Sequence, residues 1–366
     1  MTRLSFLPAF CILLSSQVNA DVPTVATDIA PVHGLVSRVM DGVGEPELLI
    51  PPTQSPHDFA LRPSQATSLA NADLMIWISP ELTPPLARSV ESIGEDVDKL
   101  TLLEVPGIEL LDFREDFEGG HDDHEEHGDH DDHDEHEEHA DGDKHDDHDD
   151  HEEHADGDKH DDHDDHEEHA DGDKHDDHDD HEEHADGDKH DDHGHAHGDD
   201  DPHAWMEPGI AVVWVDAIAE ALSELDPENA ALYSANAQAA QAEITEAAQG
   251  SADGEAARVV VFHDAYQYLE GWAGLTVVGA FLDAEAADPS AARLVELQEL
   301  FEDGDISCTI RAPQFPDDLM RNLIGTTDIP SVIVDPLGAD IPLGPQFYVA
   351  HMNAIRSSLG PCYAAN

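Results

Sequence analysis

The chain has 366 residues and a formal net charge of −70, with 85 acidic and 15 basic side chains. A surface with this balance repels phosphate groups, so the composition excludes nucleic acid and anionic lipid as binding partners. The chain contains three cysteines, and Cys11 lies near its beginning.

Residues Met1–Ala20 have the pattern of a secretory signal peptide. Arg3 gives a charged start, Phe6–Leu14 is apolar, and Val18–Ala20 is a small-residue cleavage site. The apolar stretch is too short to span a membrane. Cys11 follows Phe10, whereas a lipoprotein signal needs a small residue there. We therefore expect a soluble periplasmic protein without a lipid anchor.

From Asp21 the sequence alternates between short β-rich runs and stretches with helical apolar spacing. This alternation predicts an α/β lobe over residues 21–118, with a parallel sheet flanked by helices. We expect strands at Thr24–Ile29, Glu47–Ile50, Leu74–Ile78 and Leu100–Leu103, and helices at Val32–Asp41, Pro63–Asn71 and Leu86–Ile93.

Residues 119–201 form a run of a different kind. From His121 to His197 almost every residue is His, Asp, Glu, Gly, Ala or Lys, and the unit HEEHADGDKHDDHDD is repeated from His136 to Asp180. The run holds 23 of the 28 histidines. Its four lysines against 42 acidic residues give −38, which leaves −32 for the rest of the chain. No apolar side chain larger than alanine is present to offset the entropy of ordering the backbone, so we predict a disordered insert.

Histidine at about every third position indicates that this run collects metal ions. Neutral imidazole suits zinc, copper and nickel, whereas carboxylates alone would suit calcium or magnesium. A solubilising acidic linker is the alternative interpretation, but a linker of that kind does not need regularly spaced histidines. We expect modest affinity at each site, because a flexible chain must be ordered on binding.

Beyond the run, residues 202–226 are expected to complete the first lobe, with a helix at Pro208–Leu225. The alanine-rich sequence of residues 227–250 predicts one long, rigid helix that joins the lobes. At the usual rise it would be about 35 Å long. Residues 251–366 form the second lobe. Its expected strands are Arg258–Phe262, Thr276–Phe281, Ile306–Ile310 and Ser331–Val334, and its helices Tyr266–Gly271, Ser290–Glu302, Asp317–Gly325 and Phe347–Leu359.

Removal of the signal peptide would leave two cysteines, Cys308 and Cys362. In an exported protein an even pair is most simply a disulfide, and two unrelated buried thiols are the alternative.

Five histidines lie outside the run: His33, His57, His203, His263 and His351. His33, His57 and His263 follow predicted strands, and Asp335 ends another. In open α/β sheets, ligands bind beyond the carboxyl ends of the strands. A single histidine in such a place is more often a loop or core residue than a ligand. Several of them at strand ends in both lobes, beside a histidine-rich run, indicate a metal site.

Four short motifs resemble those of the metal-binding proteins of bacterial ABC importers. They are PHDF at Pro56–Phe59, PHAW at Pro202–Trp205, FHDAY at Phe262–Tyr266 and DPLG at Asp335–Gly338. The places of Cys308 and Cys362 and the acidic histidine-rich insert resemble the zinc-specific subgroup (the ZnuA type), which carries a disulfide there. The resemblance covers the whole mature chain. It implies a rigid two-lobed fold, an interlobe zinc site and delivery to a membrane permease.

The resemblance implies His57, His203, His263 and Asp335 as metal ligands. Pro56 departs from it, because the zinc subgroup often has glutamate there, so the fourth ligand is open between Asp335, water and His33. Three imidazoles with a carboxylate or water suit zinc better than manganese. Ligands must be deprotonated, so binding should weaken below about pH 6. His351, on the last predicted helix and away from the strand ends, is expected at the surface.

These features predict a monomeric, high-affinity zinc-binding protein that captures periplasmic zinc for an ABC permease and is not an enzyme. A zinc-dependent hydrolase would also have three histidines and an open position. However, the sequence has no HExxH motif and no glutamate placed beside these histidines as a general base. A periplasmic zinc buffer would explain the run but not the four motifs.

Overall fold

The structure is a computed structural model that describes residues 22–94, 96–114, 117, 200–249, 256–303, 305–316, 320–322, 325 and 328–364. These residues belong to one compact unit. The expected signal peptide lies outside the described residues, as does the expected insert except for its last two residues. The helix expected at Asp317–Gly325 is described only in part.

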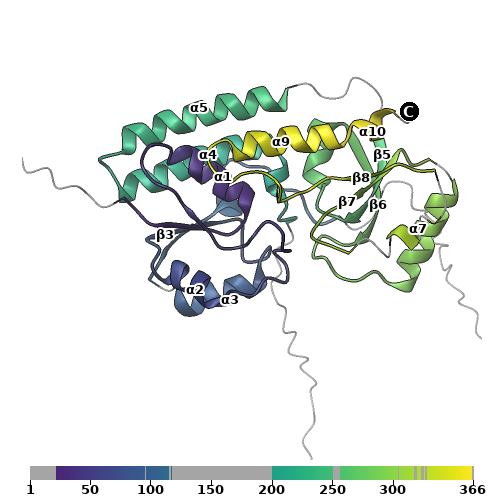
Figure 1. Ribbon diagram of the computed structural model, residues 1–366, viewed down its shortest axis with the longest axis horizontal. Coiled ribbons are helices and arrows are strands. Elements are labelled where there is room, and N and C mark those ends of the chain that lie inside the picture. Colours follow the sequence, from purple (N-terminus) through teal and green to yellow (C-terminus); the bar gives the residue numbers. More distant parts are fainter. Residues whose placement is uncertain are drawn as a thin grey trace, which may run out of the picture. The chain divides into compact units, whose positions relative to one another are not determined.

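The first lobe contains a four-stranded parallel sheet with the strand order β2-β1-β3-β4. Helices α2 and α3 lie on one side of this sheet and α1 on the other (Figure 1). Because both faces are covered, the central strand β3 is buried throughout and reads as a continuous apolar run. The elements of this lobe are β1 (Val25–Thr27), α1 (Ala30–Val39), β2 (Glu47–Leu48), α2 (Pro63–Ala70), β3 (Leu74–Trp77), α3 (Pro84–Ile93), β4 (Asp98–Thr101) and α4 (Pro208–Leu225).

The second lobe repeats this architecture, with the strand order β6-β5-β7-β8 in a second parallel sheet. Gly279 allows α7 to lie close to β6, since a Cβ at this position would lie 2.9 Å from Leu297 Cδ2. The elements are β5 (Ala257–His263), α6 (Glu270–Ala273), β6 (Leu275–Leu282), α7 (Ala291–Asp303), β7 (Cys308–Arg311), β8 (Ser331–Ile333), α9 (Phe347–Ser358) and α10 (Gly360–Ala364). Short 3₁₀ helices occur at Leu102–Glu104, Ala204–Met206 and Gln267–Leu269.

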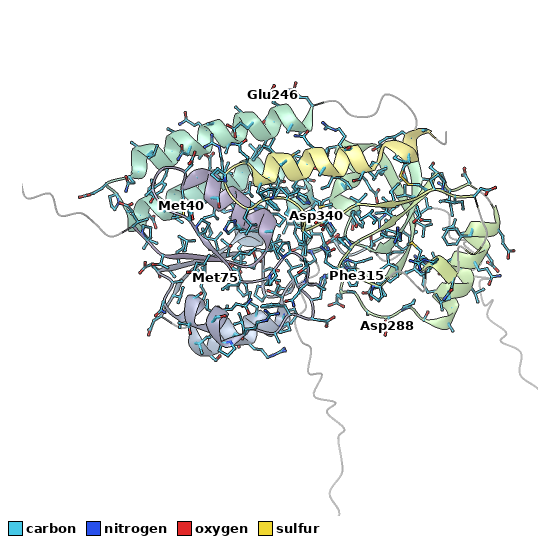
Figure 2. The ribbon with its side chains drawn as sticks, viewed as in Figure 1. Met40, Met75, Glu246, Asp288, Phe315 and Asp340 are labelled. Carbon is cyan, nitrogen blue, oxygen red and sulfur yellow. A yellow bond between two sulfur atoms is a disulfide. The ribbon has the colours of Figure 1, made fainter. Side chains whose placement is uncertain are left out.

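The two parallel sheets confirm the predicted α/β class with two lobes. One hydrophobic cluster continues from the first sheet through α4 to β5, β7 and α9. Met40 and Met75, labelled in Figure 2, are fully buried in this cluster. In both sheets the carboxyl ends of all strands share one edge, which is the edge where ligands bind in folds of this kind.

The alanine-rich helix is shorter than expected. It is α5 (Ala230–Ala248), which at 1.5 Å per residue is about 28 Å long. It starts late because the Asp226 carboxylate accepts hydrogen bonds from Asn229 Nδ2 at 2.7 Å and Tyr233 Oη at 3.0 Å, which stabilise a turn between α4 and α5. Helix α5 packs against α1, α4 and α9 (Figure 1). Its role as the link between the lobes stays a prediction.

The disulfide is confirmed. Cys308 at the start of β7 is bonded to Cys362 in α10, with their Cα atoms 5.1 Å apart. Both residues are fully buried. The bond fastens the end of the chain to the second sheet.

Within the part of the chain that the structure describes, every helix is too short or too polar to cross a membrane.

Candidate metal centre

Three of the predicted ligands come from three separate segments. His57 lies in the proline-rich segment between β2 and α2, which the buried side chain of Phe59 anchors. His203 directly precedes the 3₁₀ helix at Ala204–Met206, where the buried Trp205 donates a hydrogen bond to Pro336 O at 2.8 Å. His263 is the last residue of β5. Each histidine is therefore held by a neighbouring element with little freedom to move.

The structure brings these three histidines together. One nitrogen from each of His57, His203 and His263 lies within 4.8 Å of the others. The ring centroids are 5.5, 5.1 and 5.0 Å apart. Zinc–nitrogen bonds of about 2.1 Å would hold tetrahedral ligand nitrogens about 3.4 Å apart, which lies inside the 4.8 Å limit on the separations of these nitrogens.

The space between the rings is ion-sized. The cavity that they line has a volume of about 10 Å³, which is room for about one water molecule or ion. Phe315, labelled in Figure 2, closes one side with its ring 5.1 Å from that of His263. The remaining lining residues are Ser55, Pro56, Trp205, Ala265, Gln314, Pro336 and Leu337.

Hydrogen bonds decide which nitrogen each ring can offer. His203 Nδ1 lies 2.7 Å from Asp201 Oδ1, which leaves Nε2 for a metal. His263 Nε2 lies 3.2 Å from Ala284 O. A carbonyl oxygen can only accept, so His263 offers Nδ1. His57 Nε2 is buried and has no hydrogen-bond partner among the described residues. An unpartnered buried nitrogen is costly unless a ligand binds it, so this atom fits a metal site.

Burial keeps His57 and His263 neutral. It lowers the pKa of His57 to about 3, with a further contribution from repulsion by His203. Burial also lowers the pKa of His263 well below its ordinary value of 6.5, and His203 and His57 lower it further. Neutral imidazole is the form that binds zinc, so these two rings do not need to lose a proton near pH 7.

The structure does not bring Asp335 into this group. Its Oδ1 accepts hydrogen bonds from Leu337 N at 2.9 Å and Gln314 Nε2 at 2.8 Å, and its Oδ2 accepts one from Ala339 N at 2.6 Å. These bonds hold the turn after β8. His33, the other protein candidate for the fourth ligand, lies on α1 with Nε2 3.1 Å from Pro46 O and Nδ1 3.3 Å from Ser37 Oγ.

The expectation that His351 lies at the surface was wrong. Only 2% of the residue is exposed, and Nε2 lies 2.8 Å from Asp335 O. The inward face of α9 covers the Asp335 turn, where a Cβ on Gly338 would lie 3.2 Å from His351 Cδ2. Distance from the strand ends therefore did not mean exposure.

The sequence did not single out several residues that support the site. Asp201 contacts His203, and Gln314 Nε2 joins Asp335 to Pro52 O of the first lobe at 2.8 Å. Tyr266 Oη donates to Val334 O at 2.8 Å. Asp201 could have been found, because an acidic residue two positions before a candidate ligand is a possible hydrogen-bond partner. The other contacts depend on tertiary structure.

The protein has two α/β lobes, each with a parallel sheet, and an ion-sized cavity lined by three buried or half-buried imidazoles. These features define a solute-binding protein whose solute is a metal ion. Residues 25–360 match the family described as "Zinc-uptake complex component A periplasmic" (ZnuA). The chain belongs to this family.

Individual relatives extend over nearly the whole chain. The high-affinity zinc uptake system protein ZnuA of Paracoccus denitrificans is 37% identical over 353 residues, which are 95% of this chain and 94% of the relative. The protein of the same name from Brucella abortus is 32% identical over 365 residues, with 98% and 96% covered. A crystal structure of ZnuA has the same fold, with a TM-score of 0.62 at 16% identity, covering 94% of this chain and all of that one.

Proposed function

We propose that His57, His203 and His263 hold one zinc ion as cargo, and that the chain delivers this ion to the membrane permease of an ABC importer. The observation that carries the proposal is the convergence of one nitrogen from each histidine on a buried, ion-sized cavity. Membership of a family of periplasmic zinc-uptake components supports zinc as the cargo. The donor set supports it too, because three imidazoles suit zinc.

A water molecule is the simplest fourth ligand. Asp335 and His33 are the protein alternatives, but the two oxygens of Asp335 already accept three hydrogen bonds that hold the turn after β8. A metal held by three histidines and one water keeps a replaceable ligand, which suits a cargo that must be released.

The size of the cavity also favours an ion carrier over the alternative, a zinc-dependent hydrolase. A hydrolase needs room for an organic substrate beside the metal, and ligand pockets for such molecules measure about 300–1,000 Å³. The cavity at the three histidines measures about 10 Å³. Capture of a bare ion needs no more space than this.

The remaining parts of the proposal rest on the sequence. Residues 1–20 would direct export to the periplasm, and the chain would act there as a monomer. The run at 119–201 would collect zinc near the site, because its 23 histidines offer many weak ligands. The family description as a periplasmic component supports this location.

The test is metal binding in a chain lacking His121–His197, so that the histidines of the run do not mask the site. Protein purified without added metal should contain close to one zinc ion per chain. His57→Ala, His203→Ala and His263→Ala should each weaken zinc binding severely. His33→Gln is the matched control, because His33 is also buried but lies outside the group. Unchanged tight binding in all three alanine variants would refute the proposal.

A further inference from the structure

Asp201 binds one site histidine through its side chain. Asp201 Oδ1 lies 2.7 Å from His203 Nδ1 and accepts the His203 backbone N–H at 3.0 Å. Asp201 is 0% exposed and His203 is 1% exposed. An ionised carboxylate can only accept hydrogen bonds, so this contact places the ring proton on Nδ1 and directs the lone pair of Nε2 to the ion.

We infer that Asp201 is a positioning residue for zinc capture, which fixes the tautomer and the ring orientation in which His203 presents Nε2 to the ion. The inference rests on the proposed function, because it takes His203 as a zinc ligand. Partners of this kind orient metal-bound histidines and raise their basicity as ligands.

Asp201 is itself fixed from two sides. Its backbone N–H donates to Leu111 O at 2.7 Å, and its carbonyl accepts a hydrogen bond from Tyr268 Oη at 3.0 Å. The same Tyr268 Oη accepts the Leu111 N–H at 2.9 Å. Asp201 therefore lies where the segment before the run, the segment of His203 and the second lobe meet. A partner held in this way can impose one orientation on the ring.

The environment of Asp201 also favours an ion at His203. Its second oxygen, Oδ2, is buried without a hydrogen-bond partner among the described residues. A buried carboxylate is costly unless positive charge lies nearby. A zinc ion on His203 Nε2 supplies that charge through the ring. His263 differs, because its second nitrogen contacts the neutral carbonyl of Ala284.

The test uses the full-length chain and compares Asp201→Ala and Asp201→Asn with the natural protein. Zinc affinity of the tightest site is measured by competition with a chelator. Asp201→Ala should weaken it about 10- to 100-fold, as loss of a partner behind a metal ligand does. Asp201→Asn should weaken it less, because the amide oxygen still accepts from Nδ1.

Asp226→Asn is the control for a purely structural effect. Asp226 is also buried, at 1% exposed, and its carboxylate binds Asn229 and Tyr233 in the turn between α4 and α5. This variant should lower the unfolding temperature of the metal-free protein and leave zinc affinity unchanged. The visible spectrum of the first equivalent of Co²⁺ should change in the Asp201 variants and not in Asp226→Asn.

Three results would overturn the inference. The first is natural zinc affinity and an unchanged Co²⁺ spectrum in Asp201→Ala. The second is a fall in zinc affinity that simply follows the fall in stability, in Asp226→Asn as well as in the Asp201 variants. The third is unchanged binding in Asp201→Ala together with weakened binding in His203→Ala, which would leave the proposed function intact. If His203→Ala in the chain lacking His121–His197 bound zinc normally, His203 would not be a zinc ligand, and the inference would fail together with that part of the proposed function.

Discussion

At the scale of single residues, the Asp335 carboxylate accepts hydrogen bonds that hold the turn after β8. Its oxygens accept two backbone N–H groups of the segment that follows it, and its carbonyl lies 2.8 Å from His351 Nε2. Gln314 connects the same carboxylate to Pro52 O in the first lobe. Asp335 therefore supports the second-lobe wall of the cavity.

Asp335→Ala should lower the unfolding temperature and weaken zinc binding less than His203→Ala does. Three N–H groups lose their acceptor in this variant, at roughly 1 kcal/mol for each hydrogen bond. Zinc keeps its three imidazoles. Thermal unfolding and chelator competition on the chain without His121–His197 measure both effects. A loss of affinity as large as that of the histidine variants would identify Asp335 as the fourth ligand.

Zinc should stay in the site at acidities where free imidazoles release it. The folded protein holds His57 neutral down to about pH 3, so protons compete with zinc for this ring only at low pH. The expectation of weaker binding below about pH 6 assumed ordinary histidine pKa values, whereas burial lowers the pKa of His57 and of His263. Between pH 6.5 and about 3, the unfolded chain takes up a proton at His57 that the folded chain does not. Stability of the metal-free protein should therefore fall as pH falls through this window.

Dialysis of the zinc-loaded full-length chain at decreasing pH, with metal analysis, tests this. We expect two steps of release, the first near pH 6 from the run and the second at lower pH from the site. The chain without His121–His197 is the control and should show only the second step. A single step near pH 6 in that variant would contradict the expectation.

The grouping of His57, His203 and His263 could be predicted because their motifs, and the strand ends beside two of them, are visible in the sequence. The hydrogen bonds of Asp335 and the burial of His351 could not. Both depend on how α9 packs over the turn after β8, and these segments are assembled only by the fold.

At the scale of elements, the segment before the run is fastened to the second lobe. Arg114 forms ion pairs with Asp264 and Glu270, and its own side chain is only 13% exposed. Asp264 directly follows His263, one of the three grouped histidines. Burial raises the pKa of Asp264 to about 6, and Arg114 opposes this shift.

Arg114→Met should destabilise the protein because it leaves the Asp264 carboxylate buried without its cation. Removing one partner of a buried ion pair lowers the free energy of unfolding by about 3–5 kcal/mol. Each kcal/mol lowers the unfolding temperature by about 2–4 °C in a domain of this size. Thermal unfolding measures the effect.

Arg258→Met is the control, since Arg258 pairs with Asp305, whose side chain is 80% exposed, and such pairs contribute about 0–1 kcal/mol. Adding Asp264→Asn to Arg114→Met should recover part of the loss. Equal losses of stability in Arg114→Met and Arg258→Met would contradict a special contribution of the buried Arg114–Asp264 ion pair.

Strands were predicted best where they are apolar. Leu74–Ile78 and Arg258–Phe262 correspond to β3 and β5 within one or two residues. The strand expected at Leu100–Leu103 begins earlier, at Asp98. Its start was missed because β4 is an edge strand whose first residues are polar and exposed, so they lack the apolar pattern of a buried strand. Helix α10 was not predicted, because its Gly-Pro start indicates a chain turn.

At the scale of the whole molecule, zinc should stabilise the fold and the run should not. His57 follows β2 of the first sheet and His263 ends β5 of the second, so a single ion held by these histidines would contact both lobes. A ligand that binds only the folded chain adds about 2.7 kcal/mol of stability at a free concentration 100 times its dissociation constant. The run is not expected to stabilise the fold, because its sequence has no apolar side chain larger than alanine.

Removal of His121–His197 should therefore leave the rise in unfolding temperature with zinc unchanged, while the number of bound ions falls. The fold should tolerate the deletion, because residues on the two sides of the deleted segment are in contact. Asp112 and Asp200 form a β-bridge, and Asp201 N donates to Leu111 O at 2.7 Å. Unfolding temperatures at fixed free zinc, set with a chelator, and equilibrium dialysis measure the two quantities. His263→Ala in the deleted chain is the control and should abolish most of the rise. If the deletion itself abolished the rise, the run and not the three histidines would hold the zinc that stabilises the fold.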